Sequence, residues 1–178
     1  MKIGVFCSAN DHINKLYFEK AAELGRWIGE NGHTLVFGGC NNGLMGCIAK
    51  ATHEAGGQTI GIIPRIVEEN NRVSDHVVVH IACNNLSDRK ELLLTHSDVL
   101  VALPGGVGTL DEVFSVVASC SIGYHRKQVI LYNIDGCWDS LTTLLDDLAR
   151  RGMIRGSWTD LVKVAHSFGE VTEMLLRT

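Results

Sequence analysis

The stretch from Val99 to Glu112 constrains the fold more than any other part of the sequence. It opens with an apolar run, Val99 to Leu103, that has the length and boundaries of a buried strand. A glycine-rich turn, Pro104 to Gly108, follows, and the next residues begin a helical pattern. A buried strand that passes through a tight turn into a helix is the unit from which parallel sheets are built. The segment therefore predicts an α/β fold.

The same alternation of apolar runs and amphipathic stretches extends along the whole chain. We expect an α/β protein with a Rossmann-like three-layer sandwich around a central parallel sheet. No Pro- or Gly-rich linker interrupts the 178 residues, so a single domain, 1–178, is expected. The expected strands are Lys2–Cys7, Thr34–Phe37, Gln58–Ile63, Val77–Ile81, Val99–Leu103, Gln128–Tyr132 and Leu161–Ala165.

Three helices can be placed from their spacing and end signals. Apolar residues recur every three or four positions between the first two strands, which predicts an amphipathic helix that ends at Asn31–Gly32. A second helix is expected to open at Ser87, with Ser87 or Asp88 as its cap. Ser167 and Glu170 have the spacing of a capping box and predict a short terminal helix.

The stretch from Pro64 to Leu86 has no clear helical or strand period apart from Val77–Ile81. Such a stretch in a compact domain is often a lid or binding loop. A plain surface excursion fits the sequence equally well. Both interpretations stay open at this point.

Charge and cysteine spacing narrow the function classes. The formal net charge is -4 and the cations are scattered, so a nucleic-acid partner is not expected. No apolar run has the length of a membrane span or signal peptide, and the expected location is the cytoplasm. The six cysteines lack the spacing of a zinc site or disulfide scaffold. We expect neither a metal nor another cofactor.

The glycine turn is suited to binding an anion. In open parallel sheets, ligands bind outside the carboxyl ends of the strands, where this turn would lie. Glycines allow close approach to the backbone, and the free N–H groups of a helix start can bind phosphate. The turn has neither the Gly-Lys-Ser/Thr ending of a P-loop nor the glycine spacing of a dinucleotide fold.

Three charged side chains near the turn, Glu112, Arg89 and Lys90, suggest chemistry as well as binding. Glu112 falls in the first helical turn, and a carboxylate beside a bound phosphate implies a task on the neighbouring sugar. Arg89 and Lys90 lie in the first turn of the preceding helix. Cations there oppose the helix dipole, which favours a role in binding over a role in helix stability.

A second glycine turn, Phe37 to Gly46, is as consistent with packing as with ligand contact.

These motifs resemble the LOG (LONELY GUY) family of cytokinin riboside 5′-monophosphate phosphoribohydrolases, whose members often carry the older name lysine decarboxylase. The resemblance extends from Gly4–Cys7 through Gly43–Gly46 and Gly123–Lys127 to the C-terminal helix. Its most specific element is the family motif P-G-G-x-G-T-x-x-E, complete here from Pro104 to Glu112, together with the pair Arg89–Lys90.

The resemblance implies hydrolysis of the N-glycosidic bond of a purine nucleoside 5′-monophosphate, without a cofactor and from a homodimer. It implies that Glu112 and Arg89 are catalytic. We suggest the helix from Thr109 to Ser121 as the dimer interface, because its apolar surface is broad. The substrate-binding residues implied are Gly105, Gly106, Val107, Gly108, Thr109, Lys90, Gly39, Asn42, Met45, Ser8 and Leu86.

The chain departs from the usual family pattern at Cys40, Leu86, Ser119 and Gln128, which leaves the preferred base open. The substrate can be AMP, an N6-prenylated AMP, or both. A general AMP nucleosidase without cytokinin selectivity is one alternative. A non-catalytic carrier of a nucleotide or of molybdenum cofactor is another, since such carriers resemble the chain in fold and glycine-rich loops.

Overall fold

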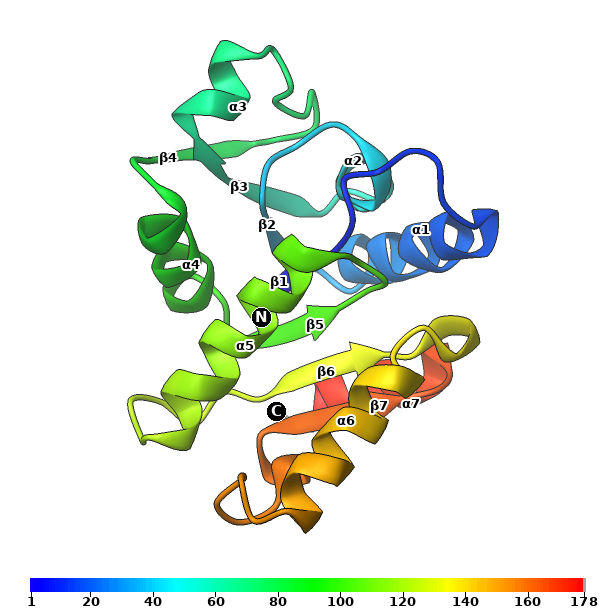
Figure 1. Ribbon diagram of the computed structural model, residues 1–178. Helices are drawn as coiled ribbons and strands as arrows, with labels where there is room; N and C mark the ends of the chain where they lie inside the picture. The colour runs from blue at the N-terminus through cyan, green and yellow to red at the C-terminus, as the bar shows by residue number, and fades with distance from the viewer. Residues whose placement is uncertain (178) are drawn as a thin grey trace.

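The computed structural model describes residues 1–177 and forms a parallel sheet of seven strands in the order β4-β3-β2-β1-β5-β6-β7 (Figure 1). The strands are β1 (Lys2–Phe6), β2 (Thr34–Phe37), β3 (Gln58–Pro64), β4 (Val79–Cys83), β5 (Val99–Ala102), β6 (Val129–Tyr132) and β7 (Val162–Ala165). The helices are α1 (Lys15–Glu30), α2 (Gly43–Glu54), α3 (Arg65–Glu69), α4 (Leu86–Thr95), α5 (Val107–Ser121), α6 (Asp139–Arg150) and α7 (Phe168–Leu176), with the 3-10 turns η1 (Ile134–Gly136) and η2 (Trp158–Asp160).

Helices cover both faces of the sheet, as the continuous apolar strands require. Side chains alternate between the faces, so neighbours such as Val101 and Ala102 belong to different cores. One core packs against α1, α2 and α7, and the other against α4, α5 and α6 (Figure 1). The prediction of a three-layer α/β sandwich with a central parallel sheet is confirmed.

The strand order reverses direction at β1, which pairs with β2 on one side and with β5 on the other. Such a switch point opens a crevice at the carboxyl ends of the two strands, because their connections leave in opposite directions. The backbone N–H of Ser8, after β1, donates to the carbonyl of Pro104, after β5, at 3.1 Å. The two turns that leave the switch point are therefore joined directly.

Most element boundaries agree with the sequence prediction within one residue, but two details were wrong. β4 runs from Val79 to Cys83 rather than from Val77 to Ile81, because Val77 turns into a core and pairing starts beyond it. The cap of α4 is Asn85, whose Oδ1 accepts the N–H groups of Ser87 and Asp88, each at 2.9 Å.

The capping box at the C-terminal helix is only partly formed. Ser167 caps α7 as predicted, because its Oγ accepts the N–H of Glu170 at 3.2 Å. The Glu170 carboxylate accepts the N–H of His166 at 2.7 Å, one residue before the cap. The predicted C-cap of α1 at Asn31, followed by Gly32 with φ 66°, is confirmed.

The stretch between Pro64 and Leu86 contains α3 and β4 and is fastened to the second glycine turn. The N–H of Asn41 donates to the carbonyl of Arg72 at 2.8 Å, and the N–H of Ser74 donates to the carbonyl of Gly39 at 2.8 Å. An isolated antiparallel bridge joins Cys40 and Val73 between these bonds. The segment therefore lies over the turn after β2, in the structure described.

The described residues can be compared with what composition suggested about disulfides, membrane spans and metal sites. All six cysteines are free. Within residues 1–177, no helix is long and apolar enough to cross a membrane. The same residues contain no group of three or more His, Cys, Asp or Glu side chains placed to share a metal ion.

Glycines allow α1 and α2 to pack closely on one face of the sheet. A Cβ atom at Gly25 would lie 2.7 Å from the backbone carbonyl oxygen of Ile48, and one at Gly29 would lie 2.7 Å from that of Thr52. A backbone atom inside a helix cannot step aside as a side chain can. Small residues at these positions therefore set the distance between the two helices.

Gly25→Ala should lower the free energy of unfolding by about 1–3 kcal/mol, because overpacking forces a backbone shift. Gly169→Ala, where a Cβ meets no atom within 4 Å, is the matched control and should leave stability unchanged or raise it. Urea denaturation followed by circular dichroism measures both. Equal stability of the two variants would contradict the packing argument.

Candidate active site

The turn from Pro104 to Gly106 leaves β5 at the switch point and leads directly into α5. Gly106 is the N-cap and has no side chain to satisfy the first backbone N–H groups. Among the described residues, the first backbone N–H group that donates within this helix belongs to Leu110, and it donates to the carbonyl of Gly106 at 3.0 Å. The N–H groups of Val107, Gly108 and Thr109 remain available to an anion.

The members of this turn have different surroundings. A Cβ at Gly106 or Gly108 would meet no atom within 4 Å, and Val107 is 85% exposed, so this part of the turn is open. Thr109 is 3% exposed, and a Cβ at Gly105 would overlap its side chain. The side chain of Thr109 therefore packs against Gly105, and the exposed hydrogen-bond donors of the turn are chiefly backbone N–H groups.

Arg89 and Glu112 form a buried ion pair beside the turn. Nη1 of Arg89 donates to Oε1 of Glu112 at 2.7 Å, and the two side chains are 13% and 4% exposed. Arg89 comes from the first turn of α4. Glu112 was expected in the first turn of its helix but lies in the second turn of α5, because that helix already begins at Val107. The two predicted catalytic residues are thus brought into direct contact.

Burial and pairing act on Glu112 in opposite directions. Loss of water raises the pKa of the Glu112 carboxyl, and the guanidinium of Arg89 beside it lowers that pKa again. Burial is the larger influence, so the pKa of Glu112 lies above its ordinary value. A carboxylate of this kind is poised to take up a proton at a higher pH than an exposed glutamate.

Gly38, at the end of β2, provides the space for the guanidinium of Arg89. A Cβ at this position would overlap Nη2 of Arg89 and would lie 3.2 Å from Sδ of Met45. Met45 is 9% exposed and belongs to the core, so it forms part of the wall behind the ion pair. Nε of Arg89 is buried and has no hydrogen-bond partner within the described residues.

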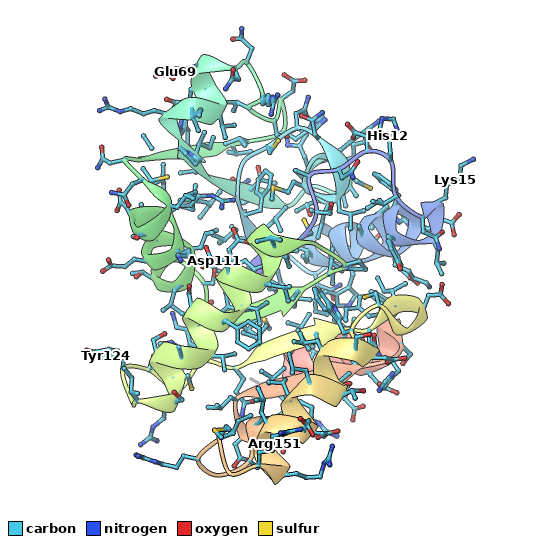
Figure 2. The ribbon with its side chains drawn as sticks, in the orientation of Figure 1. His12, Lys15, Glu69, Asp111, Tyr124 and Arg151 are labelled. Carbon is cyan, nitrogen blue, oxygen red and sulfur yellow. The ribbon has the colours of Figure 1, made fainter. Side chains whose placement is uncertain are left out.

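A second ion pair lies next to the first. Nζ of Lys90 donates to Oδ1 of Asp111 at 2.8 Å, and the side chains are 24% and 50% exposed. Figure 2 labels Asp111 at the start of α5. Two successive residues of α4 therefore hold two successive residues of α5. Lys90, predicted to bind substrate, is held by a protein carboxylate in this structure.

At the second glycine turn, a carboxylate of the protein itself accepts the hydrogen bonds of the helix start. The carboxylate of Asp11 accepts the N–H of Gly43 at 2.8 Å and the side-chain amide of Asn42 at 3.1 Å. These two hydrogen bonds lower the pKa of Asp11. Because Asp11 occupies the start of α2, Asn42 and the first N–H of this helix serve packing here.

A cavity of about 360 Å³ opens beside the main turn at the switch point. Ser8, predicted to bind substrate, lines it, and the Oγ of Ser8 accepts the N–H of Asn10 at 3.1 Å. Aromatic side chains, Tyr17 and Trp138, form part of its wall. The other residues that line the cavity are Asn10, Ile13, Pro104, Gly105, Gly106 and Cys137.

The remaining predicted residues lie at the margins of the site. Gly39 has φ 74° and lies against Ile63, and its carbonyl holds the segment over the turn. Leu86, the first residue of α4, is 61% exposed. In the proposed interface helix, Val113 and Val116 are buried against the sheet, so only part of its apolar surface is free.

Sequence analysis missed Asp111 and the role of Gly38. The signal for Asp111 was present: a second carboxylate adjoins Glu112 just as a second cation adjoins Arg89. Gly38 was visible only as part of a glycine turn. Nothing in one sequence says that the glycine after β2 makes room for an arginine on α4.

Gly38→Ala should push the guanidinium of Arg89 away from Glu112 and raise the pKa of Glu112, because Arg89 lowers that pKa. Carboxyl carbon shifts of labelled glutamate, followed by NMR across pH, measure this, with Glu112→Gln to assign the signal. Gly106→Ala is the control, since its Cβ meets no atom within 4 Å. An unchanged Glu112 titration in Gly38→Ala would refute the role of Gly38.

Comparison with known proteins identifies the family of the chain. The sequence model of a family described as "Possible lysine decarboxylase" matches residues 45–175. Cytokinin riboside 5′-monophosphate phosphoribohydrolase LOG5 of Arabidopsis thaliana is 34% identical over 174 residues, which cover 98% of this chain and 76% of that protein. LOG7 of the same plant is 35% identical over 153 residues, covering 86% of this chain and 70% of that protein.

Solved structures with the same fold include proteins that are named for binding or carrying molybdenum cofactor. The molybdenum cofactor binding protein from the phototrophic bacterium Rippkaea orientalis is 27% identical with a TM-score of 0.76, over 99% of this chain and 95% of that one. The Moco carrier protein from Chlamydomonas reinhardtii is 27% identical with a TM-score of 0.74, over the same shares. On the match to the family model and the identity to the plant proteins, this chain belongs to the LOG family.

Proposed function

We propose that the chain hydrolyses the N-glycosidic bond of a purine nucleoside 5′-monophosphate, AMP or N6-prenylated AMP, and releases the free base and ribose 5-phosphate. The observation that carries the proposal is the buried Arg89–Glu112 pair beside a helix start with free N–H groups. The names of the plant relatives, phosphoribohydrolases of a riboside 5′-monophosphate, support the same reaction.

The phosphate would bind at the start of α5, where the backbone N–H groups of Val107, Gly108 and Thr109 and the positive end of the helix dipole meet it. Gly106 and Gly108 leave the approach open, because neither carries a side chain. A phosphate held there places its ribose close to the carboxylate that begins the second turn of the same helix. The glycine turn thus positions the sugar for Glu112.

Glu112 would act on the ribose. As the C1′–N9 bond breaks, its electron pair leaves with the base and positive charge develops on the sugar, which a nearby carboxylate stabilises. Water then adds to C1′ and gives a proton to Glu112, whose raised pKa suits a general base. The departing base takes up a proton from solvent and Glu112 returns its own to solvent, so one water molecule in total is added across the broken bond. Arg89 keeps the buried carboxylate ionised and oriented before the reaction.

A non-catalytic carrier is the competing function, since a molybdenum cofactor binding protein and a Moco carrier protein share the fold. The buried Glu112 favours catalysis. A protein that only binds an anion gains nothing from a carboxylate next to that anion, and a buried carboxylate needs a partner to stay charged. A general AMP nucleosidase would use the same residues and differ only in base preference.

We also propose that the active protein is a homodimer. Support comes from the part of α5 and the following turn that the sheet does not cover. Phe114 is 37%, Ile122 71% and Tyr124 82% exposed, and Tyr124 lies beyond the far end of the helix (Figure 2). A second copy would remove these apolar side chains from water.

Glu112→Gln should lower turnover of AMP by about two to three powers of ten, because one electrostatic contact to the transition state is lost. Nucleotide binding should be largely retained, since the glycine turn is unchanged. Chromatographic release of adenine gives the rate, and calorimetry gives the affinity. Turnover near that of the unmodified protein would exclude the assigned role, and weak binding with normal turnover would limit Glu112 to holding the sugar of the nucleotide.

The 5′-phosphate should be required, whereas the prenyl group should matter little. Adenosine leaves the N–H groups of the turn without a partner, and unpaired polar groups produce strong rejection. Prenyl recognition rests on apolar contact, at about 0.8 kcal/mol for each buried methylene. Values of kcat/KM for adenosine, AMP and isopentenyl-AMP test this. Efficient cleavage of adenosine would contradict the phosphate site, and no cleavage of any of them would favour a carrier.

A further inference from the structure

A large cavity lies at the ends of the strands opposite to those that carry the glycine turn. Its volume is about 610 Å³, within the usual range for small-molecule sites. Asp98 precedes β5 and Gln128 precedes β6, so the cavity opens at the amino ends of these strands, whereas the glycine turn follows their carboxyl ends. β5 separates the two places by roughly 13 Å, the length of a four-residue strand.

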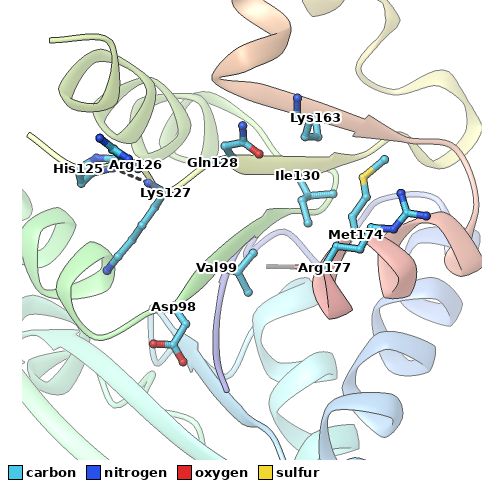
Figure 3. A pocket seen from close by; sticks show the side chains of 10 residues that line it. All are labelled: Asp98, Val99, His125, Arg126, Lys127, Gln128, Ile130, Lys163, Met174 and Arg177. Carbon is cyan, nitrogen blue, oxygen red and sulfur yellow. Dashed lines mark hydrogen bonds between the residues drawn. The ribbon is translucent and has the colours of Figure 1, made fainter. Parts of the chain in front are cut away.

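Cations from separate segments line this cavity (Figure 3). Arg126 and Lys127 come from the turn after α5, Lys163 from β7, and Arg177 from the residue that ends α7. Val99, Ile130 and Met174 form the apolar floor of the cavity. Figure 3 shows Arg126 and Lys127 to one side of Val99 and Ile130, with the side chain of Lys127 extending away from Lys163. Val99 and Ile130 are each 3% exposed, so the floor is apolar and part of the core.

The positive charge here is not neutralised by the protein. Nζ of Lys127 donates to the carbonyl of Leu94 at 2.7 Å and Nζ of Lys163 to that of Thr159 at 2.6 Å, and both acceptors are uncharged. Within residues 1–177, no carboxylate lies within 4.0 Å of these ammonium groups or of the Arg126 guanidinium.

The neighbouring groups reduce this excess only slightly. Asp98 lies on the rim and accepts the N–H of Lys2 at 2.6 Å. Arg177 forms an ion pair with Glu173. His125 adds no charge, because its Nδ1 accepts the N–H of Lys127, and burial and Lys127 lower its pKa. An excess of cations persists in a protein whose net charge is -4.

Lys163 is the least expected member of the group. It is opposite Ile130 in the β6–β7 register, and Ile130 points into a core. Residues opposite each other in register face the same side, so Lys163 occupies a position where an apolar side chain would fit. A partly buried lysine on such a face needs a reason, and a ligand with negative charge supplies one.

We propose that this cavity binds a small organic anion, which is attracted by the surplus of positive charge from Arg126, Lys127 and Lys163 and whose apolar body packs on Val99, Ile130 and Met174. The site is separate from the glycine turn and requires no part of the reaction proposed above. The charges are gathered in a pocket rather than spread along a stripe, so the ligand is a small molecule and not a nucleic-acid backbone.

The test is an NMR titration of the ¹⁵N-labelled protein with 1-naphthyl phosphate and, separately, with 1-naphthoate, which tell a phosphate ligand from a carboxylate one. Backbone signals of Arg126 to Gln128 and of Lys163 should shift with at least one of them. Uncharged 1-naphthol should bind at least tenfold more weakly. Shifts confined to Gly105–Thr109, or no shifts with either anion, would overturn the proposal.

Lys163→Met and Lys127→Met, tested separately, keep most of the apolar side chain and remove the charge. Each should weaken the binding monitored at Arg126 to Gln128 by at least tenfold, while any binding at the glycine turn stays unchanged. Lys15→Met, an exposed lysine on the opposite end of the chain, is the matched control. If Lys163 only protects the edge strand β7 from pairing, its loss would promote association and leave anion binding intact, which would refute the site.

Discussion

Helices on both faces of the parallel sheet decide where this protein can be polar. A strand that is buried on both faces has no place for a charged side chain along its length. Polar chemistry in the central strands is therefore confined to the two ends of the sheet, where strands begin and where they end. At the carboxyl edge, the reversal of strand order at β1 opens the crevice that holds the glycine turn. Arg89 and Glu112 lie beside it because α4 and α5 both start at this edge.

The ion pair then depends on what surrounds it. A buried guanidinium and carboxylate are stable together only if water is replaced by good contacts. Gly38 provides space, and Met45 forms the wall behind it. The neighbouring Lys90–Asp111 pair joins the same two helices at the next residue on each. A rotation of α4 would therefore break both pairs at once, and the site is assembled as a unit.

Much of this arrangement was readable from sequence because it follows local rules. The strands are short apolar runs, the turn is rich in glycine, and Arg89 and Glu112 belong to a family motif. What was not readable depends on contacts between distant segments. Asn85 rather than Ser87 caps α4 because its side chain reaches two N–H groups at once. The hydrogen bond from Asn42 to Asp11 forms only once the fold brings these segments together. The same is true of the close approach of the Arg89 guanidinium to Gly38.

The two glycine turns differ in one respect that affects folding. α2 begins on the carboxylate of Asp11, so its dipole has a counter-ion supplied by the chain itself. α5 begins on Gly106, with nothing comparable. The first turn of α2 is thus stabilised within the protein itself, whereas that of α5 would gain stability only from the nucleotide phosphate proposed to bind there. If that phosphate binds, thermodynamic linkage makes the resistance of the protein to heat depend on nucleotide concentration, through one helix end and not the other.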